Sequence, residues 1–219
     1  MFWLRITILI TLFILLVYVY YVRYSKNTET FITGNKEKEE EENEDELVCI
    51  LAGSEGNKYC VRDHSKKKQA AHLLERIAST CRAFVDRLIS DYPQNPFSIQ
   101  LHEKFDESKI CETLPNSEYT AFTENKGEKI SLCLTPQKDN DNGGLIDEHT
   151  LMFVAIHELT HVGTASIGHQ DDFWDNFKFM LERAKEYGYH DPVDYKATPA
   201  KYCSTTIKDN PIYDWNVKR

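Results

Sequence analysis

Three residues near the middle of the chain have the types and the spacing that can hold a metal ion and move a proton. They are His157, Glu158 and His161, in the pattern His-Glu-x-x-His. Because residues four positions apart lie on one face of a helix, both imidazoles would point toward one ion, and Zn²⁺ is the ion such ligands favour. Glu158 would take a proton from a water that the ion activates. The pattern predicts a zinc hydrolase with Glu158 as general base. The alternative is that the two histidines are ordinary hydrogen-bonded side chains at the edge of a hydrophobic core.

A zinc centre needs a third protein ligand, and His169 is the preferred candidate. It follows Gly168, where the chain can turn back toward the metal between two predicted helices. Glu182 is the alternative, because some zinc peptidases take a glutamate from the second helix. The longer pattern His-Glu-x-x-His-x-x-Gly-x-x-His is excluded, since Thr164 and Ile167 stand at its glycine and last histidine.

Two predicted helices position these groups. The first begins after Asp147, a favourable N-cap, and continues through the apolar run 151–156 to about Val162. The second begins near Asp171. Its apolar residues recur at helical spacing: Phe173, Trp174, Phe177, Met180 and Leu181.

The segments before the metal helix predict a small sheet and a backing helix, so the expected fold class is α+β with a mostly antiparallel sheet. The long helix is expected over residues 67–92, where one apolar stripe recurs at helical spacing. Strand 129–134 is expected to be an edge strand that holds an extended substrate by adding it to the sheet. The strands are expected at residues 47–51, 58–61, 97–101, 119–123 and 129–134. The first two are expected to flank a glycine-containing turn, and the last two to pair as an antiparallel hairpin around residues 125–127.

Catalysis would also need a group that stabilises the developing oxyanion, and the C-terminal segment offers candidates. Tyr202 is preferred among Tyr195, Tyr213 and His190. Metal-bound histidines usually donate their other N–H to a carboxylate or carbonyl. The carboxylates near enough in sequence are Asp171, Asp172 and Asp175.

The N-terminus predicts an anchor. Residues 6–22 are almost continuously apolar, and with Phe2 and Trp3 they approach the roughly 20 residues that span a bilayer. A cleaved signal peptide is the competing interpretation, but bulky residues follow the apolar run where small ones would be expected. We expect a transmembrane anchor at residues 1–24, an acidic disordered tether at 25–46 and one globular domain at 47–219.

The side of the membrane on which the domain lies stays open. Arg23 and Lys26 after the apolar run, against Arg5 before it, weakly favour the cytosol. The six cysteines all follow the anchor, and an even number is compatible with disulfides in an oxidising compartment or with ordinary buried thiols. The sequence thus predicts a single-pass membrane protein.

The net charge of −9, from 26 basic and 35 acidic residues, argues against a nucleic-acid partner. We find no stripe of lysine and arginine that could follow a phosphate backbone. The expected partner is a protein or peptide substrate.

The metal pattern, with Gly168-His169-x-x-x-Phe173-Trp174 after it, resembles the compact zinc peptidases of the WLM and SprT-like type. The similarity covers roughly residues 117–211, and the anchored form is similar to uncharacterised proteins of large DNA viruses. The resemblance implies a zincin fold, metallopeptidase activity, and Zn²⁺ held by His157, His161 and His169.

Two other functions remain in competition. Some relatives of this type cleave proteins crosslinked to DNA, a role that the acidic charge and the predicted anchor disfavour. The other is a membrane-anchored interaction protein or virion-structural protein whose site has lost its activity.

Overall fold

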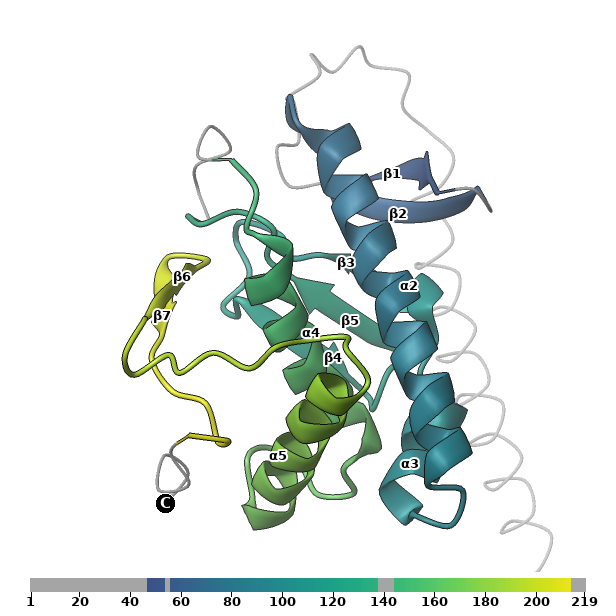
Figure 1. Cartoon of the computed structure of the whole chain (residues 1–219). Helices are drawn as coiled ribbons and strands as arrows, with labels where there is room; N and C mark the ends of the chain where they lie inside the picture. The colour runs from purple at the N-terminus through teal and green to yellow at the C-terminus, as the bar shows by residue number, and fades with distance from the viewer. Residues whose placement is uncertain (1–46, 54–55, 138–143, 214–219) are drawn as a thin grey trace, which may run out of the picture. The chain divides into compact units, whose positions relative to one another are not determined.

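The computed structural model describes residues 47–53, 56–137 and 144–213 (Figure 1). The chain divides into a unit of residues 1–43 and a compact unit of residues 44–219. The anchor predicted for residues 1–24 and the tether predicted for 25–46 lie outside the described residues. Among the helices that are described, none has the length and apolar character needed to cross a membrane.

A five-stranded sheet forms one layer of the domain. Its strand order is β1-β2-β3-β5-β4. The β1–β2 and β4–β5 pairs are antiparallel, as expected, while β3 pairs in parallel with both β2 and β5. The sheet is therefore mixed: most of its paired residues are antiparallel, as predicted, and the two parallel pairings through β3 were not predicted. The bounds are β1 Leu47–Ala52, β2 Asn57–Arg62, β3 Ile110–Glu112, β4 Ala121–Glu124 and β5 Lys129–Leu132.

The edge strand nearest the metal helix is β4, not β5. Strand β5 lies between β3 and β4, and it pairs with both. The hairpin of β4 and β5 turns at Asn125 and Lys126, both with positive φ, followed by Gly127 with φ +112°. The predicted hairpin is confirmed, but the prediction that strand 129–134 forms the edge was wrong, because sheet order depends on the non-local pairing with β3.

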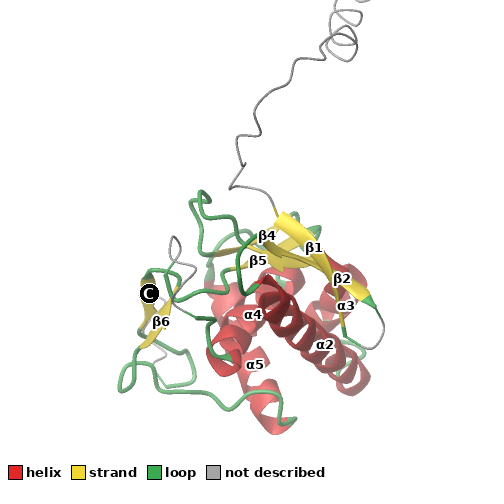
Figure 2. Ribbon diagram, turned by 90° about the horizontal axis from the view of Figure 1, so that it is seen from above, coloured by secondary structure: helices red, strands yellow, loops and turns green. Residues whose placement is uncertain are grey.

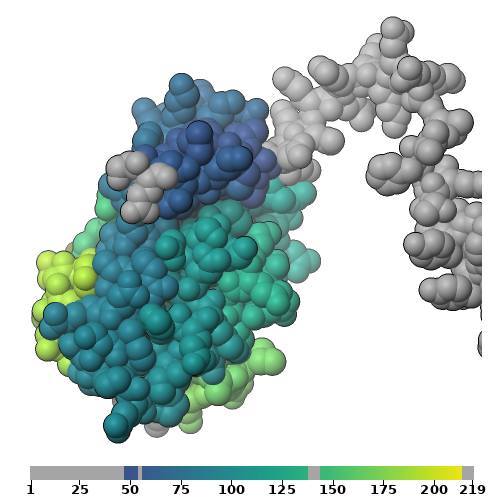
Figure 3. All heavy atoms as spheres, turned by 90° about the vertical axis from the view of Figure 1, so that its right-hand side faces the viewer, coloured from purple at the N-terminus to yellow at the C-terminus, as the bar shows by residue number. Residues whose placement is uncertain are grey.

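The helices gather on one face of this sheet (Figure 2). Helix α2 (Lys67–Asp91) is the predicted backing helix, and its apolar stripe is buried along its whole length. It ends at Tyr92, immediately before Pro93, which disfavours helical continuation. The face of the molecule drawn in Figure 3 is formed mostly by the first half of the described chain, coloured dark blue to teal.

Residues 97–101 form a helix, which corrects the predicted strand. Helix α3 spans Pro96–Lys104, with Pro96 in its first turn and the side chain of Asn95 accepting a hydrogen bond from Phe97 N. Phe97 and Leu101 are four residues apart and both are buried, so these two apolar residues also lie on one face of a helix. The apolar residues of this segment are therefore compatible with a strand or a helix. The capping signals Asn95 and Pro96 decide between the two patterns.

The two predicted metal-site helices are present. Helix α4 (Glu148–Gly163) begins at Asp147, whose carboxylate accepts a hydrogen bond of 2.8 Å from Thr150 N. Helix α5 (Asp171–Glu186) follows a seven-residue connection and packs its apolar side against α4. The remaining elements are a short 3₁₀ helix (Glu107–Lys109) and a separate hairpin of β6 (Ala200–Tyr202) and β7 (Thr205–Ile207).

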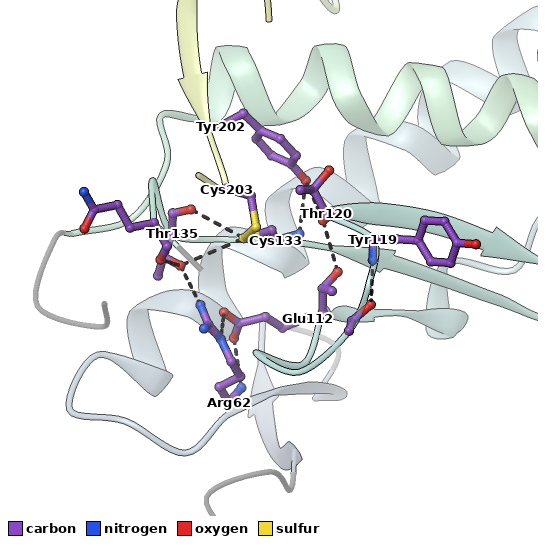
Figure 4. The surroundings of a disulfide bond; sticks show 11 residues. Arg62, Glu112, Tyr119, Thr120, Cys133, Thr135, Tyr202 and Cys203 are labelled. Atoms are coloured by element: carbon purple, nitrogen blue, oxygen red, sulfur yellow. Dashed lines mark hydrogen bonds and ion pairs between the residues drawn. A yellow bond between two sulfur atoms is a disulfide. The ribbon is translucent and has the colours of Figure 1, made fainter. Parts of the chain in front are cut away.

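Four of the six cysteines form disulfides. Cys49 and Cys60 face each other across β1 and β2, and Cys133 bonds to Cys203 in the β6–β7 hairpin. Cys81 and Cys111 are buried thiols. Beside the second disulfide, Figure 4 shows a buried ion pair in which Arg62 Nε lies 2.7 Å from Glu112 Oε1. The sequence was compatible with disulfides or with buried thiols, and the structure contains both.

Candidate metal centre

Three imidazole nitrogens converge on one point between α4 and the connection to α5. His169 Nε2 lies 3.0 Å from His157 Nε2 and 3.2 Å from His161 Nε2. The three form the one group of histidine, cysteine or carboxylate side chains in the described residues that has metal-binding geometry. His157 and His161 are brought together by one turn of α4, and His169 reaches them because Gly168 adopts φ +76°, a left-handed conformation that suits glycine.

This donor set fits Zn²⁺. Zinc bonds imidazole nitrogen at about 2.0–2.1 Å in a tetrahedral arrangement, which separates neighbouring donor atoms by about 3.3 Å. The observed separations of 3.0 and 3.2 Å are close to that value. The three Nε2 atoms face one another, and hydrogen bonds among them alone cannot give each nitrogen a suitable partner. The arrangement is therefore suited to a cation that all three nitrogens bind.

The environment keeps the imidazoles neutral, as a metal ligand must be. Burial, followed by the neighbouring His161 and His169, holds the pKa of His157 well below its usual value. Burial and His169 lower the pKa of His161 to about 4, and burial also lowers the pKa of His169.

Phe173 packs against all three histidines. Its ring is fully buried at the start of α5, stacked on His161 with centroids 4.3 Å apart, and it meets His157 and His169 edge-on at 4.9 and 4.6 Å. This single ring restricts the orientation of every imidazole in the group, which is the physical use of the aromatic residue after His169.

Glu158 lies beside the histidines and is buried. Its carboxylate accepts a hydrogen bond of 2.8 Å from the hydroxyl of Thr123 on β4. Burial raises the pKa of Glu158 to about 7, and the hydrogen bond from Thr123 opposes that shift.

The three histidines and Glu158 line a cavity of about 570 Å³ between β4 and the α4–α5 connection. One wall comes from the hairpin and the segment leading into it, and the other from the metal helix and residues 167–169. The lining residues on the hairpin side are Tyr119, Ala121, Phe122, Thr123, Asn125 and Lys126.

Lys126, in the turn of the β4–β5 hairpin, binds the C-terminal end of α4, the helix that carries His157 and His161 and is called the metal helix. Its ammonium group donates hydrogen bonds to the carbonyls of His161, Thr164 and Ser166. The His161 and Thr164 carbonyls lie at the C-terminal end of α4, where the helix dipole favours a cation, and Ser166 lies in the connection that follows. Lys126 therefore joins the helix that carries two histidines to the connection that carries the third.

The connection is held from two further directions. Gln100 on α3 donates to the carbonyls of Val162 and Thr164, and Asn176 on α5 donates to Thr164 Oγ1. The Ser166 hydroxyl donates to Asp172, which also accepts from Phe173 N in the first turn of α5. The segment before His169 is thus fixed although it has no regular secondary structure.

Other predicted site residues lie elsewhere. Glu182 is near Lys178 on the partly exposed side of α5, and it neither joins the histidine group nor lines the cavity. The Tyr202 hydroxyl is buried between Cys133 N, at 3.1 Å, and the carbonyl of Thr120, at 3.4 Å (Figure 4). The other oxyanion candidates, Tyr195, Tyr213 and His190, also lie outside the cavity lining.

Thr123 and Lys126 were missed by the sequence analysis. Neither residue has a local pattern that marks its role, because each acts across 35 or more positions. The predicted β4–β5 hairpin placed both residues near its turn, but nothing in the sequence joined that turn to the metal helix.

Comparison with known proteins places these features in a family. The WLM domain family matches residues 55–198, a range that includes every member of the histidine group and Glu158. An uncharacterized protein of Acanthamoeba polyphaga mimivirus is 28% identical over 171 residues, which cover 76% of this chain and 85% of the relative. An uncharacterized protein of invertebrate iridescent virus 3 is 39% identical over 84 residues, covering 38% of this chain and 49% of the relative.

Solved structures of Wss1 are more distant. Wss1 from Saccharomyces cerevisiae is 20% identical, with a TM-score of 0.42, over 58% of this chain and 89% of that one. A mutant of the same protein gives a TM-score of 0.43 at 19% identity, over 59% of this chain and 92% of that one.

Proposed function

Because the chain belongs to the WLM domain family, we propose that it is a zinc-dependent metallopeptidase that hydrolyses a peptide bond in an extended segment of a protein. One observation carries the proposal. Three imidazole nitrogens converge within hydrogen-bonding distance of one another, beside the buried carboxylate of Glu158, on the wall of a cavity that a peptide can enter.

His157, His161 and His169 would hold the Zn²⁺ ion. When bound, zinc lowers the pKa of a water toward neutrality and polarises the carbonyl that the water attacks. Glu158 takes the proton from the attacking water and passes it to the leaving amine. Thr123 keeps the carboxylate turned toward the cavity during both transfers, and Phe173 keeps the imidazoles in their ligating orientations.

The substrate would lie along β4. This strand ends the described sheet, and its outer edge faces the cavity through Ala121, Phe122 and Thr123. An extended peptide can add to such an edge through main-chain hydrogen bonds, which bind it without regard to sequence. Because Thr123 contacts Glu158, a peptide held on β4 is brought next to the general base.

Cleavage of a peptide library by the purified, zinc-loaded chain tests the proposal, with the apoprotein as its control. We expect cleavage that stops on chelation and returns with zinc. A chain that binds no zinc and cleaves nothing would contradict the proposal and favour an interaction or virion-structural protein.

We further propose that residues 1–24 anchor the enzyme to a viral or host membrane. The support is the apolar composition of residues 6–22 together with the acidic run that follows them. In an alkaline carbonate wash of expressing cells, the full chain should stay with the membranes and a chain beginning at Leu47 should not. Release of the full chain by carbonate would contradict the anchor.

A further inference from the structure

We infer that the site selects peptides with a large apolar side chain beside the scissile bond, which Tyr119, Phe122 and Ile167 receive on the cavity wall. The inference rests on the proposed function and names the substrate class of the same site.

Two of the apolar residues that line the cavity, Tyr119 and Ile167, face solvent, which few large apolar residues of the described domain do. Four large hydrophobic side chains are exposed among the described residues: Leu51, Tyr119, Ile167 and Tyr213. Two of the four line this cavity, and Ile167 is the most exposed, at 86%. An exposed apolar cluster at a cavity marks a surface that binds a partner or a ligand.

These residues stand next to the catalytic groups on two different segments. Ile167 lies two residues before His169, in the connection between α4 and α5. Phe122 directly precedes Thr123, and its ring packs against that of Tyr119 with centroids 6.0 Å apart. A peptide positioned for hydrolysis would therefore pass both apolar surfaces within a residue or two of the cleaved bond.

The charges of the cavity disfavour a charged side chain in the same place. Apart from the histidines, Glu158 and Lys126 are the ionisable groups in the described lining whose side chains carry charge. Glu158 is reserved for proton transfer, and the Lys126 ammonium is already bound by three carbonyls. A charged substrate side chain would lose hydration there without gaining a partner.

The expected selectivity follows from burial of apolar surface. One methylene more or less in an apolar pocket changes kcat/KM by about 10–200-fold. A peptide with Leu or Phe beside the cleaved bond should exceed its Ala counterpart by about tenfold or more, and its Asp counterpart by more than that.

The test compares peptides that differ only at the residues flanking the cleavage site, using the zinc-loaded full chain. Ile167→Asp and Tyr119→Asp should lower kcat/KM for Leu and Phe peptides by about tenfold or more, and by less for the Ala peptide, so that the preference for Leu over Ala falls. Zinc content is measured in each variant so that loss of the metal is distinguished from loss of the preference. The matched control is Leu51→Asp, since Leu51 is an exposed apolar residue outside the cavity. Its preference should equal that of the unchanged protein.

Equal cleavage of Leu, Ala and Asp peptides by the unchanged protein would overturn the inference, and so would a preference that survives both cavity variants. Binding of fluorescent peptides to the zinc-loaded Glu158→Gln variant separates recognition from hydrolysis. If the unchanged protein cleaves nothing, the proposed hydrolysis is contradicted, and selective binding of the Leu peptide that Ile167→Asp removes would still support recognition of an apolar side chain by this cavity. If the unchanged protein cleaves nothing and binds no peptide selectively, both the proposed hydrolysis and this inference are overturned.

Discussion

The hydroxyl of Thr123 donates a hydrogen bond of 2.8 Å to the carboxylate of Glu158, and it lies 3.2 Å from the carbonyl of the same residue. Thr123 belongs to the edge strand β4, and Glu158 belongs to the metal helix α4. The strand proposed to hold the substrate and the helix that carries the proposed general base are therefore joined by a direct contact.

Replacing Thr123 by Val should lower kcat by about tenfold, because a hydrogen bond to a charged group is worth about 1.5 kcal/mol or more. Steady-state kinetics and zinc analysis measure the effect, and zinc content should not change. Thr123→Ser keeps the hydroxyl and should keep most of the activity. An unchanged kcat in Thr123→Val would show that the contact does not position the carboxylate.

Replacing Lys126 by Met should weaken zinc binding by about 10–100-fold, as loss of a group that orients metal ligands commonly does. The reason is that the ammonium joins the carbonyls of His161, Thr164 and Ser166, and so fixes His169 relative to α4. Competition with a chromophoric chelator measures the affinity without any substrate.

Lys126→Arg should restore part of the zinc affinity, because it keeps the charge and several donors. Lys109→Met removes a lysine that lies near Asp106, outside the cavity, and should bind zinc like the unchanged protein. If Lys126→Met also binds zinc normally, the histidines are positioned without this lysine.

His169 and Glu182 were the two candidates for the third ligand, and they predict opposite results. His169→Ala should lose zinc under conditions in which Glu182→Ala retains one ion per chain, because only His169 joins the convergent nitrogens. Zinc analysis after gel filtration measures both variants. Loss of zinc from Glu182→Ala with retention in His169→Ala would reverse the assignment.

Local signals in the sequence were sufficient for much of this fold. The apolar stripe of α2, the Asp147 cap of α4 and the hairpin around Gly127 each depend on neighbouring residues, and the structure contains all three. The convergence of His157 and His161 also follows from one turn of helix.

The rest required contacts between distant residues. The alternation from Phe97 to Leu101 is compatible with a strand or a helix, and the cap at Asn95 decided it. The edge position of β4 depends on β3, a strand of three residues that no periodicity revealed. Lys126 acts on carbonyls 35 to 40 positions away, so no local pattern could identify it.

The disulfide between Cys133 and Cys203 should stabilise the domain more than that between Cys49 and Cys60. The sequence separations are 70 and 11 residues, and loop closure in the unfolded chain gives about 4.4 and about 2.8 kcal/mol, respectively. The test is to replace both cysteines of one disulfide by alanine, for each disulfide in turn, and to compare the free energies of unfolding in urea. The opposite order would show that native contacts, not loop entropy, dominate.

The same disulfides bear on which side of the membrane the domain would lie if the proposed anchor is present. Disulfides persist in oxidising compartments and are rare in the cytosol. Protein isolated with thiols blocked at lysis should therefore show both bonds by peptide mapping under non-reducing conditions. Four alkylated cysteines at these positions would favour the cytosolic orientation that Arg23 and Lys26 suggested.

The most direct test of a zinc peptidase at this site is to measure zinc content and peptide cleavage side by side in the unchanged protein and in Glu158→Gln. The account predicts one zinc per chain in both proteins and cleavage in the unchanged protein alone, because the amide keeps the shape of the carboxylate but cannot accept the proton. Cleavage by Glu158→Gln at the unchanged rate, or absence of zinc from both proteins, would contradict it.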